Sequence, residues 1–204
     1  TFKRSRVLTM HYLALLKGIN VGTSGRIRMD ALKRLFEEAG FFDVVTYIQS
    51  GNVLFQSDLE ADAARDVIER ALKQGASITT TAVLRSSGEL AQIIRHCPFT
   101  PDEITHAQAQ NTAGESLYVC LLPQTPDEKT LDSLRAVVSG QDVFRVFGRE
   151  VYLLLQQSIR TSKLAIRLQK LVPNLTVRNW NTMQALYALA SPLEGTQGGL
   201  NDTC

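Results

Sequence analysis

The residues with the clearest potential for chemistry form a glycine-rich, basic loop, GINVGTSGRIR, at residues 18–28. Its glycines, among them Gly18 and Gly22, allow backbone N–H groups to approach a ligand closely. The loop leads into a predicted helix, and a helix N-terminus favours anions. Arg26 and Arg28 can form bidentate contacts with phosphate or carboxylate. These features favour a site for a small anionic ligand.

Neither of the common phosphate-binding fingerprints fits this loop. No Gly-Lys-Ser/Thr closes it as in a Walker A motif, and the glycine spacing does not match GxGxxG. A second interpretation stays open, in which the glycines only turn the chain and the arginines only remain solvated. The ligand interpretation is favoured because the corresponding connection in the second half of the chain, residues 122–125, has no glycine.

The chain repeats one pattern of elements twice, and this repeat must position the loop. Apolar periodicity and turn residues predict, in each copy, a strand, a helix, a hairpin, a second helix, a fourth strand and a third helix. In the first copy they cover 12–16, 29–39, 44–56, 64–72, 79–84 and 90–94, and in the second 117–122, 131–138, 143–155, 164–172, 175–178 and 183–190. The order βαββαβ is that of the ferredoxin-like fold. We therefore expect an α+β protein, a tandem duplication of a ferredoxin-like βαββαβ unit, each with an extra C-terminal helix.

The boundaries of this organisation follow from composition. The first repeat is expected at 10–97 and the second at 117–190, joined by a polar linker with two prolines at 98–116. Residues 1–9 are expected to be a disordered extension, and residues 191–204 a flexible tail.

Helix ends are marked by turn and capping residues. Gly40 and Gly140 are expected to end the first helix of each copy. The run Thr125-Pro126-Asp127-Glu128 predicts a capping box at the start of the second copy's first helix.

The repeat brings a second segment to the loop. In a βαββαβ unit the third strand pairs with the first, so the turn after Gln49 should lie beside the end of the first strand. We expect Asn52 near the Gly18–Asn20 backbone, with its side chain bonded to that loop or facing the same pocket. The full set of expected ligand-binding residues is Lys17, Gly18, Asn20, Gly22, Arg26, Arg28, Ser50, Gly51 and Asn52.

Two further polar clusters are secondary candidates for a site. The run RNWNT at 178–182 joins the last strand to the last helix, where Asn179 or Asn181 can cap the helix and Trp180 can pack between the copies. The pair Ser162-Lys163 resembles a nucleophile and its base but lacks the SxxK spacing, which favours a capping serine and a solvated lysine. The secondary candidates are Ser162, Lys163, Arg178, Asn179, Trp180 and Asn181.

Composition excludes several classes of function. A net charge of +2 is too small to indicate a nucleic-acid or membrane partner, and no apolar run reaches the roughly 20 residues of a membrane-spanning helix. The three cysteines are far apart and the three histidines isolated, so neither a metal site nor a cofactor is predicted. The N-terminal residues lack the apolar stretch of a signal peptide, and a cytoplasmic location follows by default.

The same clusters carry a resemblance to a known family. The motifs LLKGINVG (15–22), TYIQSGNVLF (46–55), SKL (162–164) and RNWNT (178–182), in this order, resemble the uncharacterised bacterial domain-of-unknown-function 1697 family. The resemblance implies a ferredoxin-like duplication in a cytoplasmic protein without an established activity. It transfers no catalytic residue.

Two classes of function are compatible with these features. The first is a binding protein, or an enzyme, for a nucleotide or phosphorylated metabolite at the loop; no His, Cys or carboxylate near the loop is an obvious general base. Asp30 is the nearest carboxylate, and the helix dipole explains its position. The alternative is a protein–protein interaction module. RNA or single-stranded DNA binding ranks below it because neither hairpin has an RNP-type run. The sequence leaves the oligomeric state undecided.

Overall fold

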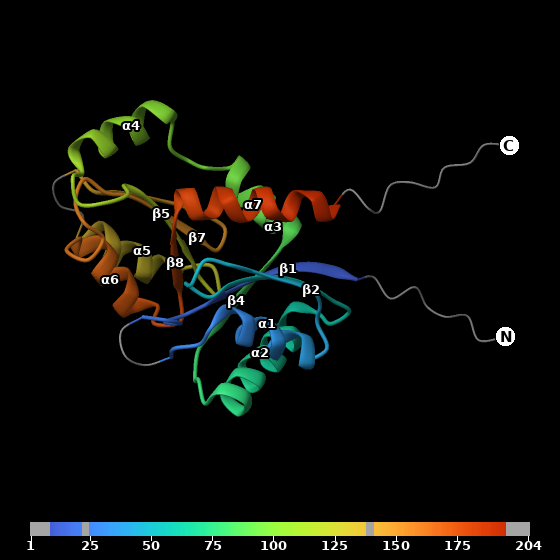
Figure 1. The fold of residues 1–204 in the computed structure, drawn as a ribbon. Helices are drawn as coiled ribbons and strands as arrows, with labels where there is room; N and C mark the ends of the chain where they lie inside the picture. The colour runs from blue at the N-terminus through green and yellow to red at the C-terminus, as the bar shows by residue number, and fades with distance from the viewer. Residues whose placement is uncertain (1–8, 22–24, 138–140, 195–204) are drawn as a thin grey trace, which may run out of the picture. The chain divides into compact units, whose positions relative to one another are not determined.

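The described part of the chain forms two compact units with mixed α+β structure. The computed structural model describes residues 9–21, 25–137 and 141–194. One unit comprises the described residues up to Leu90 together with those from Leu186, and the other comprises the described residues of Ala91–Ala185 (Figure 1). The division falls inside two helices, α3 (Ser87–Arg95) and α7 (Trp180–Glu194).

Each unit contains one four-stranded antiparallel sheet. The elements up to α3 are β1 (Met10–Leu16), α1 (Met29–Glu38), β2 (Phe42–Tyr47), β3 (Asn52–Ser57), α2 (Ala61–Ala76) and β4 (Ala82–Ser86). Between α3 and α7 follow α4 (Pro101–Gln110), β5 (Leu117–Leu121), α5 (Glu128–Arg135), β6 (Val143–Phe147), β7 (Glu150–Leu154), α6 (Lys163–Leu171) and β8 (Thr176–Asn179).

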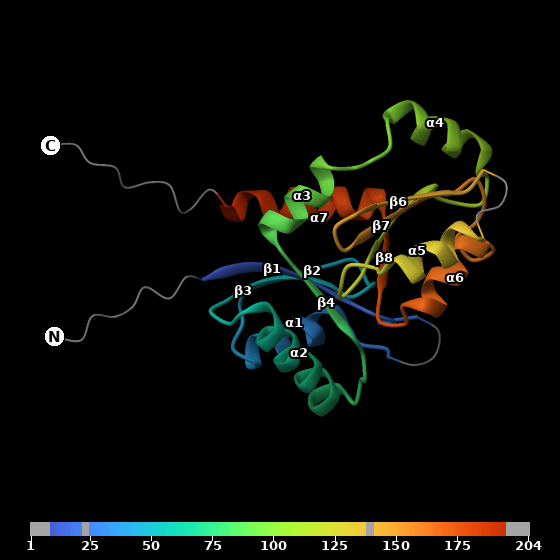
Figure 2. The same cartoon turned by 180° about the vertical axis from the view of Figure 1, so that it is seen from behind.

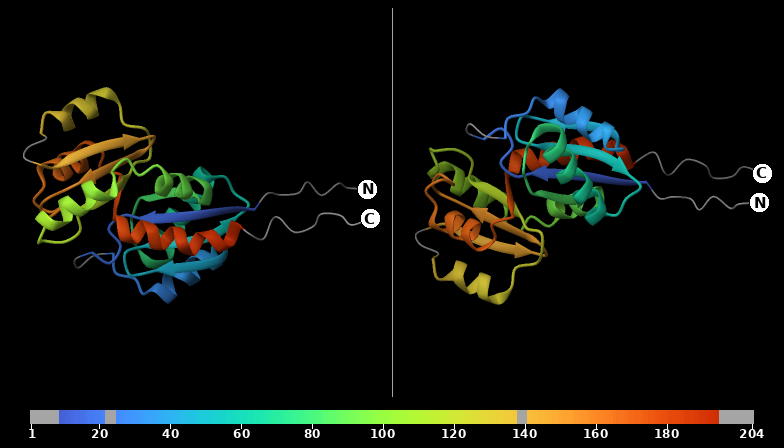
Figure 3. Two further views of the ribbon diagram at one scale, coloured as in Figure 1. Left: turned by 90° about the horizontal axis from the view of Figure 1, so that it is seen from above. Right: turned by 90° about the horizontal axis from the view of Figure 1, so that it is seen from below.

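The first sheet has β1 and β3 as its inner strands. The strand order is β2-β3-β1-β4, and Figure 3 shows β1 in dark blue from above and from below. β1 pairs with β3 through Leu13↔Leu54 and Leu15↔Asn52, and with β4 on its other side. The pairing of the third strand with the first is as expected from the sequence. It brings the β2–β3 turn to the end of β1.

The core of the first unit lies between this sheet and the helices α1 and α2. Alternate strand residues point to it, such as Leu16 and Phe55, because side chains alternate between the faces of a strand. The helices contribute residues at helical spacing, Leu32 and Phe36 from α1 and Ile68 from α2. Both helices lie on the same face of the sheet in opposite views (Figures 1 and 2).

The second unit repeats this arrangement. Its sheet has the order β6-β7-β5-β8, and Leu121 pairs with Glu150 where Leu15 pairs with Asn52 in the first sheet. Its core contains Leu134 of α5, Leu168 of α6 and Val151 of β7. Figure 2 shows these three elements side by side. The two units therefore share element order, sheet order and the side on which their first two helices pack.

The segment 98–116, expected to be a polar linker, contains the helix α4. A capping box starts it: Thr100 accepts a hydrogen bond from the Glu103 backbone N–H, and the Glu103 carboxylate accepts one from the Thr100 N–H. Pro101 occupies the first turn. Periodicity missed the helix because only Ala107 of it is buried.

Several expected boundaries differ in detail. Helix α5 is capped by Asp127, whose carboxylate accepts the Thr130 N–H, and the expected capping box at Thr125 was wrong. The fourth strands begin later than expected, at Ala82 and Thr176. Helix α7 extends to Glu194, four residues into the expected tail. Residues 1–8 and Gly140 lie outside the described residues.

An arginine of the sheet edge holds the start of α4. Arg145 of β6 donates to both carboxylate oxygens of Glu103, at 2.7 and 3.1 Å, and to the Pro98 carbonyl at 2.6 Å. Its guanidinium also lies 4.3 Å from the centre of the Phe99 ring. Hydrogen bonds from Arg145, and then from Thr100, lower the pKa of Glu103 to about 2.

We expect the replacement Glu103→Gln to remove an acid-dependent part of the stability. The folded-state pKa of Glu103 lies below its ordinary value of 4.5, so its contribution is complete above that value and is lost as the pH falls towards 2. Glutamine can also accept the hydrogen bond of the capping box, so the variant tests the contribution of the Glu103 charge alone. The wild type should therefore exceed Glu103→Gln in urea midpoint at pH 7, with a gap that narrows from pH 5 to pH 3. A gap independent of pH would contradict this assignment.

Candidate functional site

The β2–β3 turn and the loop after β1 are joined by the register of the sheet. Leu15 lies opposite Asn52, and one residue later the Leu16 N–H donates to the Gly51 carbonyl at 2.8 Å. β1 therefore ends against the turn, and the chain that continues from it must pass beside residues 48–51.

Gly51 is required at this contact. Its φ is +72°, and a Cβ built on it would lie 2.9 Å from the Leu16 Cβ and 3.0 Å from the Ile19 Cβ. Ile19 is buried in the core of the first unit, so neither neighbour can withdraw easily. The absence of a side chain at Gly51 is what allows the turn to press against the loop.

Asn20 ties the loop to itself and to the turn. Its side-chain Nδ2 donates to the Ile27 carbonyl at 2.9 Å and to the Gln49 carbonyl at 3.0 Å. Its Oδ1 accepts the Ile27 N–H at 2.8 Å, and its own N–H donates to the Gly25 carbonyl. A φ of +58° makes this geometry possible, and asparagine tolerates that region better than most residues. The Asn20 amide thus bonds backbone groups of Ile27 and Gln49 that lie outside the strand ladders, and in this way it closes the loop.

The start of the loop is anchored to the segment just before β4. The Thr80 hydroxyl donates to the Lys17 carbonyl at 2.6 Å, and the Lys17 N–H donates to the Thr81 carbonyl at 3.0 Å. Gly18 and Gly25 both have positive φ, at +68° and +66°. The start of the loop is therefore held on one side by the residues before β4 and on the other by the β2–β3 turn.

A surface hollow of about 270 Å³ opens where the loop enters α1. It is lined by Asn20, Arg26, Ile27, Arg28, Met29 and Gln49. Arg26 and Arg28 carry the positive charge of this lining. Helix α1 begins at its edge with Arg28 as N-cap, and the Arg28 side chain makes no capping hydrogen bond. The hollow thus combines cationic side chains with the N-terminus of a ten-residue helix.

An acidic residue partly neutralises this charge. Arg28 donates to Asp30 through Nε at 3.0 Å and through Nη2 at 3.3 Å, and both side chains are exposed. The hydrogen bond from Arg28 is the main reason why the pKa of Asp30 lies below its ordinary value. An anion in the hollow would compete with Asp30 for the Arg28 guanidinium.

Only part of the set of ligand-binding residues expected from the sequence lines the hollow. Asn20, Arg26 and Arg28 line it, whereas Lys17, Gly18, Ser50, Gly51 and Asn52 do not. Gly22 lies outside the described residues.

Asn52 is a buried residue of the hairpin. Its side chain donates to the Tyr47 carbonyl at 3.1 Å and to the Ser50 hydroxyl at 2.9 Å. A side-chain hydrogen bond that joins the loop to the turn runs from Asn20 to the Gln49 carbonyl. Sequence reasoning missed Gln49, because the position of its carbonyl is visible only once the strands are paired.

Ser162 of the secondary candidates has a structural role. It is buried, and its Oγ accepts the Ala165 N–H as N-cap of α6 and donates to the Asp142 carboxylate at 2.9 Å. Asp142 also accepts hydrogen bonds from Gln157 and from the Gln156 N–H. Lys163 is exposed at the first position of α6. The pair is a capping serine beside an exposed lysine, the interpretation favoured from the sequence.

The residues of the RNWNT run are also engaged locally. The Asn179 Oδ1 accepts the Thr182 N–H at the start of α7, and Asn181 donates to Glu115. Arg178 donates to the Val177 carbonyl, and burial lowers the pKa of Arg178 to about 10. The Trp180 ring lies 6.5 Å from that of Tyr152. In the described ranges no three His, Cys, Asp or Glu residues gather in a way that could hold a metal ion.

Comparison with known families connects these features to other proteins. Residues 10–152, which include the loop and the β2–β3 turn, match the model of a family described as "protein of unknown function (DUF1697)". The chain belongs to this family. None of the curated proteins compared with the chain matches it.

A solved structure shares the fold. The conserved bacterial protein SP0830 from Streptococcus pneumoniae is similar over 90% of this chain and 99% of its own, with a TM-score of 0.70 and 17% identity. At this identity the similarity concerns the fold alone. Within the described residues no helix is both long and apolar enough to cross a membrane.

We expect Gly51→Ala to destabilise the protein more than Gly40→Ala. Both glycines have positive φ, so both variants incur about 1–2 kcal/mol of backbone strain. Only the new Cβ at position 51 would overlap Leu16 and Ile19, which adds about 1–3 kcal/mol, whereas position 40 has no heavy atom within 4 Å. Urea unfolding of the two variants measures the difference. Equal losses of stability would show that the turn does not press against the loop.

Proposed function

We propose that this protein binds a small anionic ligand, a nucleotide or a phosphorylated metabolite, in the hollow formed by the loop 18–28 and the adjoining turn. The single observation that carries the proposal is the hollow itself, which holds Arg26 and Arg28 at an uncapped helix N-terminus. Guanidinium groups and free backbone N–H groups are the donors that phosphate groups prefer.

The backbone around the hollow supports this function because hydrogen bonds within the protein already position it in the absence of a ligand. The Asn20 side chain makes three hydrogen bonds that hold the loop and the turn in one arrangement. Asn20 and Asn52 are therefore positioning residues in the proposal, rather than ligand contacts of their own. Residues such as Asn20 and Ile27 that are already held in place lose little conformational freedom on binding, which favours affinity.

The pairing of Arg28 with Asp30 gives the proposed site an internal competitor. A divalent phosphate offers Arg28 a stronger bidentate partner than one exposed carboxylate. Arg28 can then exchange Asp30 for the ligand, while Arg26 supplies a second charge. No residue of the hollow is proposed as a general base, so the proposal is one of binding rather than of catalysis.

A protein-interaction function is the second candidate, and exposed apolar residues favour it. Val21 and Ile48 are 68% and 50% exposed, and both adjoin the Asn20–Gln49 hydrogen bond. Ile48 also has a φ of +47°, a strained conformation for a β-branched residue. On the edge strand β2, Phe42 and Val45 are exposed as well. Exposed apolar residues of this kind mark many interaction sites.

Nucleic-acid binding in the manner of an RRM has less support. That mode needs aromatic side chains on the open face of the sheet. Leu13, Leu15 and Leu54 share the face of the first sheet that points away from α1 and α2, and all three are buried and aliphatic. The inner strands β1 and β3, which carry the stacking aromatics in an RRM, therefore offer no aromatic platform on this face.

We also infer that the two units are copies of one ferredoxin-like βαββαβ unit, with repeats at 10–97 and 117–190. The sheet orders β2-β3-β1-β4 and β6-β7-β5-β8 support this inference, as do the matching registers at Leu15 and Leu121. A duplicated protein whose copies differ mainly in one loop is free to use that loop for binding. We expect it to act in the cytoplasm.

We expect inorganic phosphate, adenosine monophosphate or glucose 6-phosphate to raise the melting temperature at millimolar concentration. Arg26→Ala should weaken binding about tenfold to a hundredfold, because one charge-assisted hydrogen bond contributes about 1.5–3 kcal/mol. Asp30→Asn should strengthen binding, since it releases Arg28. Differential scanning fluorimetry followed by titration calorimetry measures both effects.

The matched control is Arg167→Ala, which removes an exposed arginine from α6 in the other unit. It should leave ligand affinity unchanged. The proposal fails if none of the three anions stabilises the protein, or if Arg26→Ala and Arg167→Ala behave alike.

A further inference from the structure

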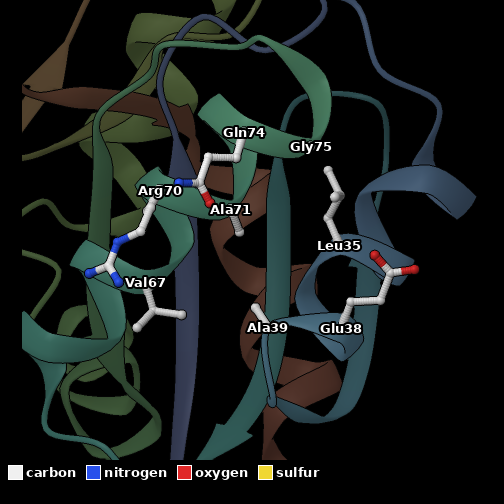
Figure 4. A pocket seen from close by; sticks show the side chains of 8 residues that line it. All are labelled: Leu35, Glu38, Ala39, Val67, Arg70, Ala71, Gln74 and Gly75. Carbon is white, nitrogen blue, oxygen red and sulfur yellow. The ribbon is translucent and has the colours of Figure 1, made fainter.

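A second hollow lies on the outer side of the helices α1 and α2, away from the loop. We call it the α1–α2 groove, about 410 Å³ in volume and lined by Leu35, Glu38, Ala39, Val67, Arg70, Ala71, Gln74 and Gly75 (Figure 4). Its lining residues come from two helix faces at spacings of three and four residues. All of them belong to the first unit. The volume is within the range of small-molecule sites.

The base of the groove is apolar and shallow because its residues are small. Ala39 of α1 and Ala71 of α2 leave space between the helices, and Leu35 fills the position that a side chain at Gly75 would occupy. Leu35, Ala39 and Val67 are partly buried and pack against the core of the first unit. A ligand in the groove would therefore cover apolar surface that is already held in place.

Two opposite charges flank this apolar base. Figure 4 shows Glu38 on the α1 side and Arg70 on the α2 side, with the Arg70 guanidinium pointing away from Glu38. Within the described part of the chain neither side chain forms a hydrogen bond or an ion pair. Other charged residues of the same helices do: Arg65 pairs with Asp62, and Glu69 accepts the Ala82 N–H. The two side chains at the groove are thus available to a ligand.

We propose that the α1–α2 groove binds a short zwitterionic peptide, a free dipeptide with an apolar side chain. Its carboxylate would pair with Arg70, its ammonium group with Glu38, and its side chain would cover Ala39 and Ala71. Packed helices lie about 8–10 Å apart, and two extended residues span about 7 Å. The long, exposed Glu38 and Arg70 side chains can turn towards the groove and cover the remaining distance, so a dipeptide reaches both charges more readily than a single amino acid.

This inference is independent of the anion site. The groove shares no lining residue with the hollow at Arg26 and Arg28, and it needs both signs of charge rather than positive charge alone. A protein that failed to bind phosphate would leave the dipeptide proposal untouched, and the converse also holds.

The test is a titration of the ¹⁵N-labelled full chain with L-alanyl-L-leucine, followed by NMR. We expect saturable shifts at the amides of Leu35, Ala39, Ala71 and Gly75, and none at those of Ile27 and Met29. N-acetylation or C-terminal amidation of the dipeptide should each raise the Kd about three- to tenfold, because each removes one charge pair. Free leucine should bind more weakly than the dipeptide.

Variants of the groove separate its two charges. Arg70→Gln should lower the affinity for the dipeptide and abolish the difference between the dipeptide and its amide, and Glu38→Gln should do the same for the acetylated form. Lys73→Gln, an exposed change on α2 outside the groove lining, is the matched control and should have no effect. An unchanged spectrum of the remaining amides shows that each variant is folded.

Three results would overturn the proposal. The first is the absence of saturable shifts at the groove, and the second is equal loss of affinity in Lys73→Gln and Arg70→Gln. The third is equal binding of a dipeptide blocked at both ends. That result would mean that the groove accepts an apolar segment of a longer chain, such as a partner helix, instead of a zwitterion.

Discussion

The antiparallel pairing of β1 with β3 is the constraint on which the rest of the first unit depends. Their register sets Leu15 opposite Asn52, and it therefore forces the β2–β3 turn against the chain that leaves β1. Gly51 makes that approach sterically possible, because any side chain there would overlap Leu16 and Ile19. Ile19 then joins the core, so the start of the glycine-rich loop is held by packing as well as by hydrogen bonds. The hollow before α1 is a consequence of this pairing.

The polar residues near the hollow divide into asparagines that bond the loop and arginines that line the hollow. Both the nitrogen and the oxygen of the Asn20 amide form hydrogen bonds with backbone groups, at Ile27 and Gln49. Asn52 serves the hairpin in a similar way, through Tyr47 and Ser50. Asparagines that bond the backbone in this way are expected where the chain leaves a β-sheet, because the peptide groups there have lost their partners in the neighbouring strand. What distinguishes the hollow is therefore its arginines and the free helix end, rather than its amides.

Most helices and strands could be predicted because their signals are local. Apolar spacing in α1, with Leu32 and Phe36 on its buried face, and the short apolar run of β1 follow from periodicity alone. Helix α4 was missed for a physical reason. It buries only Ala107, and its start depends on a capping box and on Arg145, which approaches from a strand more than forty residues later. Contacts of that range leave no periodic trace in the sequence.

The sequence by itself determined the family, the order of the elements within the two repeats and the chemical character of the loop, since motifs, periodicity and charge are properties of the chain. Only the tertiary structure decided which residues meet. It brought the Gln49 carbonyl to the Asn20 amide, because a backbone carbonyl acquires its position from strand register and not from residue type. It also opened the α1–α2 groove, whose Glu38 and Arg70 come from separate helices. Their relation depends on how those helices pack on the sheet, which no local pattern encodes.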